Sequence, residues 1–567
     1  MANLNISAQA QQTFDAIVIG SGISGGWAAK ELCEKGLKTL VLERGRMVRH
    51  GEDYPTMHLD PWDMPGRGAL TPEQAASRHV QRRTGFVGGA NVHFYVNDTT
   101  HPYTETQRFD WIRGDQVGGR SLIWGRQCYR WSDLDFAANA RDGVGVDWPI
   151  RYRDIEPWYD YVERFVGVSG EKLGLAHLPD GQFLKPMELN CLERHAKSAI
   201  EKQFPGRRMT IGRVAHLTEP LNGRGTCQFR NRCDRGCPYG AYFSSNAVTL
   251  PAAEKTGHLT LRPDTIVTDL IYDDARRRVT GVRVVDAATK TTSEYFARLV
   301  FVNASTVATT ALLLNSTSAR YPNGLGNDSG ELGHNMMDHH YFVGAMGGYD
   351  GFKQEYYKGR RPNGVYIPRY RNLTGRREAP YLRGYGYQGG AGRGDWSGGT
   401  AAPGFGATFK DGLLQPGDWG MMLNGFGECL PYHQNRMTID RNTRDAWGQP
   451  TITFDCAFRE NELTMRKQMQ VDAAEMLEAA GVKNILTFDY IGGMGKGVHE
   501  MGTARMGRDP RTSVLNGRNQ VHGVPNVFVT DGACMTSASC VNPSITYMAL
   551  TARACAFAVD ELKKGNL

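Results

Sequence analysis

The pattern of hydrophobic and polar positions near the start of the chain predicts a strand, a turn, a helix and a second strand, in that order. Residues 14–20 (FDAIVIG) form a short apolar run typical of a buried parallel strand, and residues 37–42 (LKTLVL) form a second one. Between them, residues 27–36 (WAAKELCEKG) predict a helix that ends at Gly36. This pattern predicts an α/β domain whose first strands are parallel.

The turn after the first strand has the glycine spacing of a dinucleotide-binding loop. Gly20 allows a tight turn, Gly22 lets the backbone approach a pyrophosphate, and Gly25 lets the helix pack closely on the strand. The helix N-terminus would face the phosphates, and Glu43, which ends the second strand, would bind the ribose hydroxyls. A glycine-rich turn without a ligand is the alternative, but the strand, helix and acid in this order favour a bound nucleotide.

Later segments predict other kinds of structure. Residues 415–456 alternate like antiparallel strands, NVFVTD at 526–531 predicts one more strand, and roughly 543–563 predict a long helix. Asn542 before Pro543 has the residue types of a helix N-cap followed by the first helical position. Residues 351–405 are rich in Gly, Arg and Tyr, which suits a sugar pocket and a plain surface loop equally.

Composition limits the class of protein. The 567 residues are enough for two joined domains, and a net charge of +7 without a run of five like charges argues against nucleic acid as a partner. The sequence has neither the basic and apolar regions of a signal peptide at its start nor an apolar run of about 18 residues, so we expect no direct membrane span. Eleven cysteines, mostly scattered, do not form a disulfide framework and indicate folding in a reducing compartment.

Three of the cysteines are clustered as Cys227-x5-Cys233-x3-Cys237. A disulfide would leave one thiol over, and a structural zinc usually takes four ligands in closely spaced pairs. An iron–sulfur cluster fits this spacing best, because soft thiolates suit it and the final Cys-Pro is similar to ferredoxin loops. Three thiolates match a [3Fe–4S] cluster, whereas a [4Fe–4S] cluster would need a fourth ligand. Nearby basic residues either stabilise such a negative cluster or form a solvated surface: Arg224, Arg230, Arg232 and Arg235.

Several further motifs together resemble the glucose–methanol–choline (GMC) oxidoreductase family along nearly the whole chain. Within that family the chain is most similar to the flavoprotein large subunits of bacterial sugar dehydrogenases, and among them to glucoside 3-dehydrogenase. The motifs are VGGRSLIWG at 117–125, NAST at 303–306 with LNS at 314–316, GHNMMDH at 333–339, HEMGTARMG at 499–507, VTDG at 529–532 and NPSIT at 542–546.

The resemblance implies an α/β fold with a Rossmann-type FAD-binding domain and an α+β substrate domain built on an antiparallel sheet. It assigns residues 1–50, 85–140, 210–345 and 490–567 to the FAD domain, with the cysteine loop at 224–240, and residues 51–84, 141–209 and 346–489 to the substrate domain. We expect non-covalent FAD, because Ile123 stands where covalent relatives have a histidine. Further residues that the resemblance places at the cofactor are Gly118, Gly119, Ser121, Trp124, Asp531, Gly532, Pro543 and Thr546.

The resemblance also implies the chemistry. His499 would act as the base that takes the hydroxyl proton, since an imidazole titrates near neutrality, and Asn542 would hold the same oxygen. We expect an FAD-dependent dehydrogenase that oxidises the C3 hydroxyl of glucosides and disaccharides to 3-keto sugars. A glucose 1-dehydrogenase or other sugar or polyol dehydrogenase, an oxygen-using pyranose oxidase and a non-catalytic electron-relay subunit stay open as alternatives.

Partners follow from the same resemblance. An iron–sulfur cluster would pass electrons from FAD to a cytochrome c or another acceptor, so we expect a dehydrogenase with a small subunit. Related subunits are exported folded with a partner that bears the signal. We therefore expect a periplasmic enzyme, with the cytoplasm as the alternative.

Overall fold

The computed structural model describes residues 13–60, 62–355, 362–374, 377–394 and 404–567. Its first sheet is largely parallel and is centred on β1 (Thr13–Ile19), which pairs with β2 (Thr39–Leu42) on one side and β8 (Thr292–Val302) on the other. The two apolar runs at the start of the chain are therefore neighbouring parallel strands, as predicted. The remaining strands are β18 (Val524–Val529), β17 (Gln520–Val521), β5 (Leu259–Arg262), β6 (Thr265–Asp273) and β7 (Arg278–Asp286).

Two helices that lie at opposite ends of the sequence cover one face of this sheet. The predicted helix between the first strands is α2 (Ile23–Glu34), and the predicted C-terminal helix is α13 (Ser544–Lys563). Small side chains such as Ala28 of α2 and Ala558 of α13 pack with the sheet in one hydrophobic cluster. α10 (Thr306–Asn315) follows β8 directly, so that the turn between them lies at the carboxyl end of the sheet.

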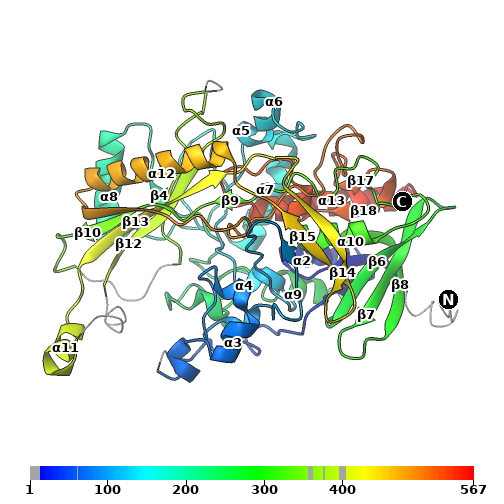
Figure 1. Cartoon of the computed structure of the whole chain (residues 1–567), viewed down its shortest axis with the longest axis horizontal. Coiled ribbons are helices and arrows are strands. Elements are labelled where there is room, and N and C mark those ends of the chain that lie inside the picture. The colour runs from blue at the N-terminus through cyan, green and yellow to red at the C-terminus, as the bar shows by residue number, and fades with distance from the viewer. Residues whose placement is uncertain (1–12, 61, 356–361, 375–376, 395–403) are drawn as a thin grey trace.

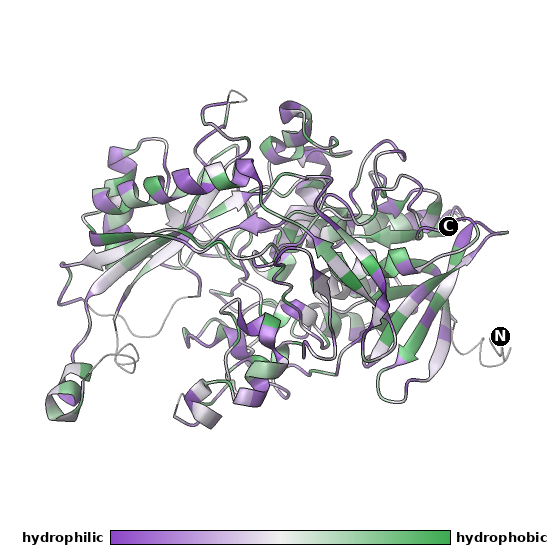
Figure 2. Cartoon of the chain, viewed as in Figure 1, coloured by the Kyte–Doolittle hydropathy of each residue, from purple (hydrophilic) through white to green (hydrophobic). Residues whose placement is uncertain are grey.

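The second sheet is antiparallel and lies on the other side of the molecule (Figure 1). α12 (Glu460–Ala479) and α8 (Cys191–Gln203) pack on it through one hydrophobic cluster. α12 carries both hydrophobic and hydrophilic residues (Figure 2), and its buried positions include Met465, Met469, Ala473 and Met476 at helical spacing. In order, its strands are β16 (Lys483–Asp489), β10 (Val343–Tyr349), β13 (Trp419–Glu428), β12 (Tyr385–Arg393), β11 (Val365–Ile367) and β4 (Thr210–Ile211), and β9 (His339–His340) pairs with β13.

A small third sheet holds the rest of the predicted antiparallel segment. β14 (Arg436–Arg444) pairs with β15 (Pro450–Asp455), and β3 (Thr104–Glu105) joins β15. The alternating pattern over residues 415–456 is thus confirmed as β13, β14 and β15, and the predicted α/β class with an antiparallel second sheet is confirmed. The exact division into domains stays a prediction, and β4 and the start of β10 belong to the antiparallel sheet although the sequence boundaries gave 210–345 to the FAD domain.

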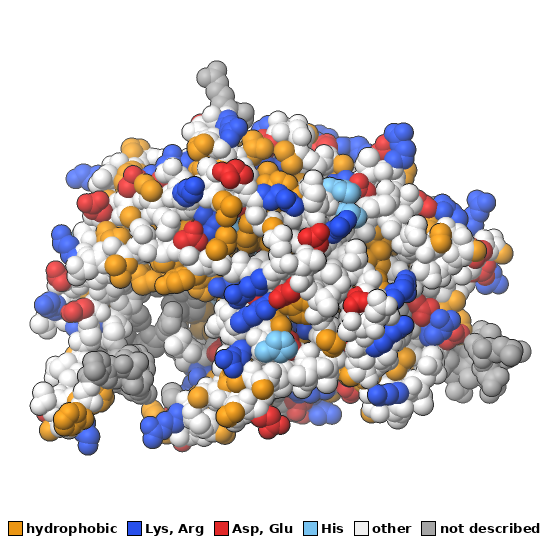
Figure 3. Space-filling view, in the orientation of Figure 1, with side chains coloured by type: hydrophobic (Ala, Val, Ile, Leu, Met, Phe, Trp, Pro, Cys, Tyr) orange, Lys and Arg blue, Asp and Glu red, His pale blue; other side chains and the backbone are white. Residues whose placement is uncertain are grey.

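Charged side chains of both signs are interspersed over the face of the molecule that Figure 3 shows. Among the helices that the structure describes, none is long and apolar enough to cross a membrane.

Candidate active site

A cavity of about 700 Å³ lies at the carboxyl ends of the parallel strands, where ligands of open α/β sheets bind. Four parallel strands are each followed, within two residues, by a residue that lines this cavity. These residues are Gly20 after β1, Glu43 after β2, Asn303 after β8 and Asp531 after β18. The far wall comes from the antiparallel sheet and includes Gln388 of β12 and Phe426 of β13.

The glycine loop has the close backbone approaches that its spacing predicts. Gly20 has a φ of +92°, and a Cβ there would lie 2.5 Å from the carbonyl oxygen of Asn303. A Cβ on Gly25 would lie 1.9 Å from the carbonyl oxygen of Gly20, so the helix packs on the turn only without a side chain. A Cβ on Gly22 would meet no described protein atom within 4 Å, and Gly22 borders the cavity. This leaves room for a phosphate beside the N-terminus of α2, which no described side chain caps.

Glu43 is tied to this loop from the end of β2. Its carboxylate accepts hydrogen bonds of 3.0 Å from the backbone N–H of Ser21 and of 3.0 Å from that of Gly45. Burial raises the pKa of Glu43. Glu43 therefore shapes the phosphate loop as well as lining the cavity, and its bond to the ribose stays a prediction.

The second glycine-rich loop packs directly on the first. The backbone N–H of Gly118 donates to the hydroxyl of Ser21 at 2.9 Å, and a Cβ on Gly119 would lie 3.5 Å from the Cα of Gly22. Ser121 is fully buried and accepts a hydrogen bond from the backbone N–H of Ser245. Of the predicted cofactor contacts in this loop, three line the cavity: Gly119, Ser121 and Trp124.

The C-terminal contacts divide in the same way. Asp531 and Gly532 line the cavity, and burial raises the pKa of Asp531 to about 6 against hydrogen bonds from Thr309 and Ala533. Pro543 and Thr546 do not line it: Pro543 stands at the N-cap of α13, and the Thr546 hydroxyl is 2.7 Å from that of Tyr159. Gly25 and Gly118 also lie behind the cavity wall, where they support the loops that face it.

The residues of the cavity fit a dinucleotide. Besides the open Gly22 and the uncapped helix α2, the wall carries several buried polar groups without a partner among the described residues, and two of them are the amide nitrogen of Asn303 and the hydroxyl of Tyr547. Buried polar groups are normally hydrogen-bonded, so these two atoms await a polar ligand. Ile123 also borders the cavity, and its aliphatic side chain offers no atom for a bond to a flavin.

His499 and Asn542 meet at the far end of the cavity, although 43 residues separate them in the sequence. The amide nitrogen of Asn542 lies 3.4 Å from Nε2 of His499. Val498, directly before His499, has a φ of +56°, which is costly for a β-branched residue and which the surrounding contacts must impose. Burial lowers the pKa of His499 well below its ordinary value, and the neighbouring Arg120 cation and His339 imidazole lower it further. His499 is therefore a neutral imidazole at neutral pH.

The predicted helix-capping role of Asn542 is wrong. α13 begins at Ser544 with Pro543 at the N-cap and no side-chain cap bond. The Asn542 side chain turns instead to the cavity, where its oxygen accepts a hydrogen bond of 2.7 Å from Nε2 of Gln388. Tertiary hydrogen bonds have overridden the local preference.

Sequence analysis missed three residues behind this pair. Gln388 lies in the Gly- and Tyr-rich segment, part of which (356–361, 375–376 and 395–403) falls outside the described residues. His339 has its Nδ1 2.8 Å from Nδ1 of His499, and Asp338 accepts hydrogen bonds from the backbone N–H groups of both histidines. Asp338 and His339 belong to the GHNMMDH motif, so a signal was present, but the motif does not reveal that its last residues reach His499.

The cysteine loop does not form a metal-binding group in this structure. All eleven cysteines are free thiols, so the disulfide alternative for this loop is not realised. Within the described part of the chain, no group of three His, Cys, Asp or Glu side chains is placed to hold a metal ion. Burial raises the pKa of Cys227 to about 11 and also raises that of Cys233, which favours the thiol form. Cys227 and Cys233 line a second hollow that shares Gln388 and Phe426 with the first cavity.

The arginines around this loop bind backbone and carboxylate oxygens of neighbouring segments. Arg224 donates to the carbonyl of Val166 at 2.7 Å, and Arg235 donates to that of Leu59 at 3.0 Å. Arg230 bonds to the carbonyl of Met57, and Arg232 pairs with Asp60. The structure thus gives these side chains a role in fastening the loop to residues 57–60 and to α7 (Tyr152–Val166).

Comparisons with known proteins agree with this geometry. The family model described as GMC oxidoreductase matches the chain in two parts, residues 14–341 and 431–551. The chain is 27% identical to 2-methyl-1,2-propanediol dehydrogenase of Mycolicibacterium austroafricanum, over 97% of this chain and 95% of the relative. It is 25% identical to the fructose dehydrogenase large subunit of Gluconobacter japonicus over the full length of both. Pyridoxine 4-oxidase from Mesorbium loti has a similar fold, with a TM-score of 0.60 at 16% identity over 96% of this chain and 98% of that one.

Proposed function

The chain belongs to the GMC oxidoreductase family and is an FAD-binding oxidoreductase of CH–OH groups, and we propose that it oxidises the C3 hydroxyl of glucosides and disaccharides to 3-keto sugars. The observation that carries a catalytic role is the pair formed by His499 and Asn542 at the end of the dinucleotide cavity. A sugar is supported by the similarity to a fructose dehydrogenase large subunit along the whole chain. The position C3 rests on the sequence resemblance to glucoside 3-dehydrogenase.

The two side chains divide the work on the substrate hydroxyl. FAD, when bound, supplies the acceptor for the hydride that leaves the carbinol carbon. The neutral imidazole of His499 takes the hydroxyl proton at Nε2, which is why its lowered pKa matters. Asn542 donates a hydrogen bond from its amide nitrogen to the same substrate oxygen while that oxygen becomes a carbonyl oxygen. The substrate thus loses its O–H proton to His499 and its C–H hydride to the cofactor, and the product is a ketone.

FAD is bound without a covalent link in this proposal. Ile123 stands at the cavity wall where covalent relatives have a histidine, and an aliphatic side chain forms no such bond. Acid precipitation of the holoenzyme should release all of the flavin into the supernatant. Flavin that stays with the precipitated protein would overturn this part of the proposal.

Transfer of electrons through an iron–sulfur cluster at Cys227, Cys233 and Cys237 stays a prediction from the cysteine spacing. Its support is that the loop borders a hollow continuous with the substrate end of the cavity. Because the three thiols do not gather into a metal-binding group, no step of the mechanism above runs through a cluster. Iron and acid-labile sulfide measured on anaerobically purified protein decide the matter, and a reading of zero would remove both the cluster and the proposed relay to a cytochrome c.

A small partner subunit is part of the proposal. The chain is similar to a protein named as the large subunit of fructose dehydrogenase, and the antiparallel sheet ends in the edge strand β16. Hydrophobic side chains form a row on the antiparallel-sheet side of the molecule (Figure 3), and those exposed on and beside β16 are Leu486, Tyr490 and Ile491. Exposed edge strands with apolar side chains mark sites of association. Export to the periplasm together with that subunit is proposed as well, and strictly cytosolic recovery in cells that also make the partner would contradict it.

The substrate is tested by anaerobic bleaching of the flavin with methyl α-glucoside beside free glucose. The methyl group blocks oxidation at C1, so bleaching by the blocked sugar requires a ring hydroxyl other than that at C1. Bleaching by free glucose alone would make the protein a glucose 1-dehydrogenase. Stoichiometric peroxide in air would indicate an oxidase, and no bleaching by any sugar or polyol would indicate a non-catalytic electron-relay subunit.

A further inference from the structure

Behind the proposed base lies a chain of hydrogen bonds whose direction is fixed at one end by the backbone. His339 on β9 is buried, and its Nε2 lies 2.8 Å from the carbonyl oxygen of Ser539. A carbonyl oxygen only accepts hydrogen bonds. Nε2 of His339 therefore carries a proton and donates it to Ser539.

The other nitrogen of His339 then has only one role. Burial lowers the pKa of His339 to about 4, so the ring is neutral near pH 7 and its Nδ1 holds a lone pair. That Nδ1 lies 2.8 Å from Nδ1 of His499. His499 must donate in this contact, and its proton is therefore on Nδ1.

The same reasoning continues to the substrate side. His499 is neutral, so a proton on Nδ1 leaves Nε2 with a lone pair that faces the cavity. The amide nitrogen of Asn542 donates toward Nε2, and the Asn542 oxygen accepts from Gln388. Each donor in the series from Gln388 to Ser539 meets an acceptor, and reversing any one bond would set two donors or two acceptors against each other.

We propose that His339 is a positioning residue that fixes His499 in the tautomer whose Nε2 is free to take the substrate proton. The inference rests on the proposed function, because it assigns the state of the base used there. His339 itself does not line the cavity and acts through its contact with His499, which does.

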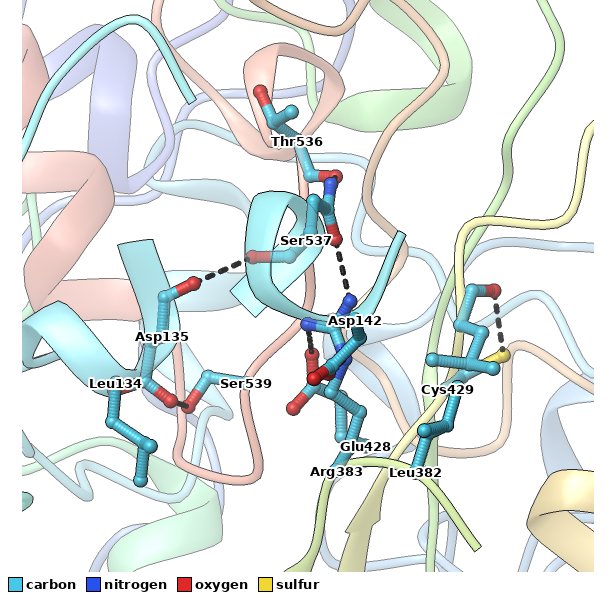
Figure 4. A network of polar contacts seen from close by, with 12 residues as sticks. Leu134, Asp135, Asp142, Leu382, Arg383, Glu428, Cys429, Thr536, Ser537 and Ser539 are labelled. Carbon is cyan, nitrogen blue, oxygen red and sulfur yellow. Dashed lines mark hydrogen bonds and ion pairs between the residues drawn. The ribbon is translucent and has the colours of Figure 1, made fainter. Parts of the chain in front are cut away.

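The surroundings hold the two imidazoles and their anchor in place. One carboxylate oxygen of Asp338 accepts from the backbone N–H of His339 at 2.8 Å and from that of His499 at 3.1 Å. Ser539 has a φ of +55°, and its hydroxyl donates to Asp135 at 2.7 Å. Figure 4 shows Ser539 and Ser537 both turned toward Asp135, which fastens the loop whose carbonyl anchors His339.

Among the described residues, the charged groups around His499 do not offer its Nδ1–H another hydrogen-bond acceptor. Glu500 is paired with Arg120 at 2.7 Å, and Asp338 is engaged by backbone N–H groups, including those of Gly495 and Gly497. Without His339, the Nδ1–H of His499 would stand unpaired in a buried place, which disfavours this tautomer by a factor of roughly 10 to 100.

Two substitutions at His339 separate a tautomer effect from a loss of packing. H339L removes the Nδ1 acceptor, whereas the side-chain oxygen of H339N lies near the position of that nitrogen and can still accept a hydrogen bond. The matched control is H340L, which removes the adjacent buried imidazole, whose ring nitrogens make no hydrogen bond to the described residues. We expect flavin reduction by saturating substrate to fall by roughly 10- to 100-fold in H339L, to recover at least in part in H339N, and to stay near wild type in H340L.

Nitrogen NMR of holoenzyme labelled at histidine gives a direct reading, with the His499 signals assigned by their loss in H499Q. A protonated Nδ1 and a bare Nε2 at His499 support the inference, and a protonated Nε2 overturns it even if H339L does not fold. If H499A is still reduced at the wild-type rate, the proposed base is wrong. If H499A is inactive while H339L is reduced like wild type, only the positioning role of His339 is wrong.

Discussion

The side-chain oxygen of Asn542 accepts a hydrogen bond of 2.7 Å from Nε2 of Gln388, which comes from the antiparallel sheet on the other side of the cavity. This contact decides which end of the Asn542 amide faces His499. With its oxygen held by Gln388, Asn542 presents its nitrogen to Nε2 of His499 and to the cavity. A residue of the second sheet thus orients the side-chain amide of Asn542, which lies just before α13.

Changing Gln388 should reverse that orientation. In Gln388→Glu the new carboxylate only accepts, so it attracts the Asn542 nitrogen and turns the oxygen toward Nε2 of His499. We expect flavin reduction to slow by roughly tenfold, the equivalent of one hydrogen bond of about 1.4 kcal/mol. Gln388→Leu, which removes the contact without reversing it, should have a smaller effect. Stopped-flow reduction of both variants measures this, and equal rates in Gln388→Glu and wild type would contradict the assigned orientation.

The pH dependence of flavin reduction follows from the neutral state of His499. A base works when it is unprotonated, which is the case above its pKa. Burial, together with the neighbouring Arg120 cation and His339 imidazole, puts that pKa well below the ordinary 6.5. The reduction rate should therefore be flat from pH 8.5 to below 6.5, with any acid limb at lower pH. Burial also raises the pKa of Asp338, which accepts the backbone N–H of His499, to about 7. An inflection between pH 6.5 and 7.5 in anaerobic stopped-flow data that persists in Asp338→Asn would show that the base is not this buried imidazole.

Stability should also depend on pH through the buried histidines. His339 has a folded-state pKa of about 4 and an ordinary value of 6.5, so the unfolded chain takes the proton first as pH falls. The stability that its neutral state contributes is fully present above pH 6.5 and is lost as pH falls toward 4. The loss in the free energy of unfolding amounts to about 3 kcal/mol at pH 4. Thermal midpoints should decline over this range, and His339→Asn should decline less steeply. Identical slopes in the two proteins would refute the buried neutral state of His339.

Two glycines of the phosphate loop should respond differently to alanine. Gly22 has a φ of −67°, and a Cβ there meets no described protein atom but enters the cavity. Gly22→Ala should fold normally and bind FAD more weakly, by about 1 to 3 kcal/mol. Gly25→Ala places a Cβ 1.9 Å from the Gly20 carbonyl and should lower both stability and FAD content. Flavin titration beside apoprotein melting distinguishes the two, and tight FAD binding by Gly22→Ala would place the pyrophosphate elsewhere.

Local pattern was sufficient for the parts of this site that neighbours in sequence create. The turn through Gly20, Gly22 and Gly25 is determined by a strand, a helix and their close packing, and all of these lie within 25 residues of one another. The helix that became α13 and the strands within 415–456 likewise follow from periodicity. The family motifs added His499 and Asn542, which the structure brings to one cavity.

Contacts between distant segments were beyond the sequence. His339 and His499 are 160 residues apart, and Gln388 and Asn542 are 154 apart, so their meeting depends on how the two sheets are joined. The same dependence explains the error at Asn542, where a good capping sequence gave way to a bond across the cavity. At Cys227, Cys233 and Cys237, spacing alone predicted a shared ligand, whereas backbone contacts of the loop determine where the sulfur atoms point.

A buried ion pair between the two parts of the molecule gives the last prediction. Arg383, which precedes β12, is fully buried and forms ion pairs with Glu428 at 3.0 Å and Asp142 at 2.8 Å. Figure 4 draws these three residues close together. The guanidinium of Arg383 also donates to Asn139, whose amide in turn donates to the carbonyl of Thr536 at 2.8 Å. The network therefore connects the antiparallel sheet to the segment that carries Ser537 and Ser539.

Removing one partner from this network leaves buried charge without compensation. Arg383→Met should cost about 3 to 5 kcal/mol, because the Glu428 carboxylate stays buried without its cation, whereas the double variant with Glu428→Leu should recover much of that loss. Arg511→Met, which breaks the solvent-exposed pair with Asp509, is the matched control and should leave the thermal midpoint unchanged. Because the network also holds the loop of Ser539, Arg383→Met should slow flavin reduction even where FAD stays bound. A variant with a wild-type midpoint and rate would show that the loop is held by Asp135 alone.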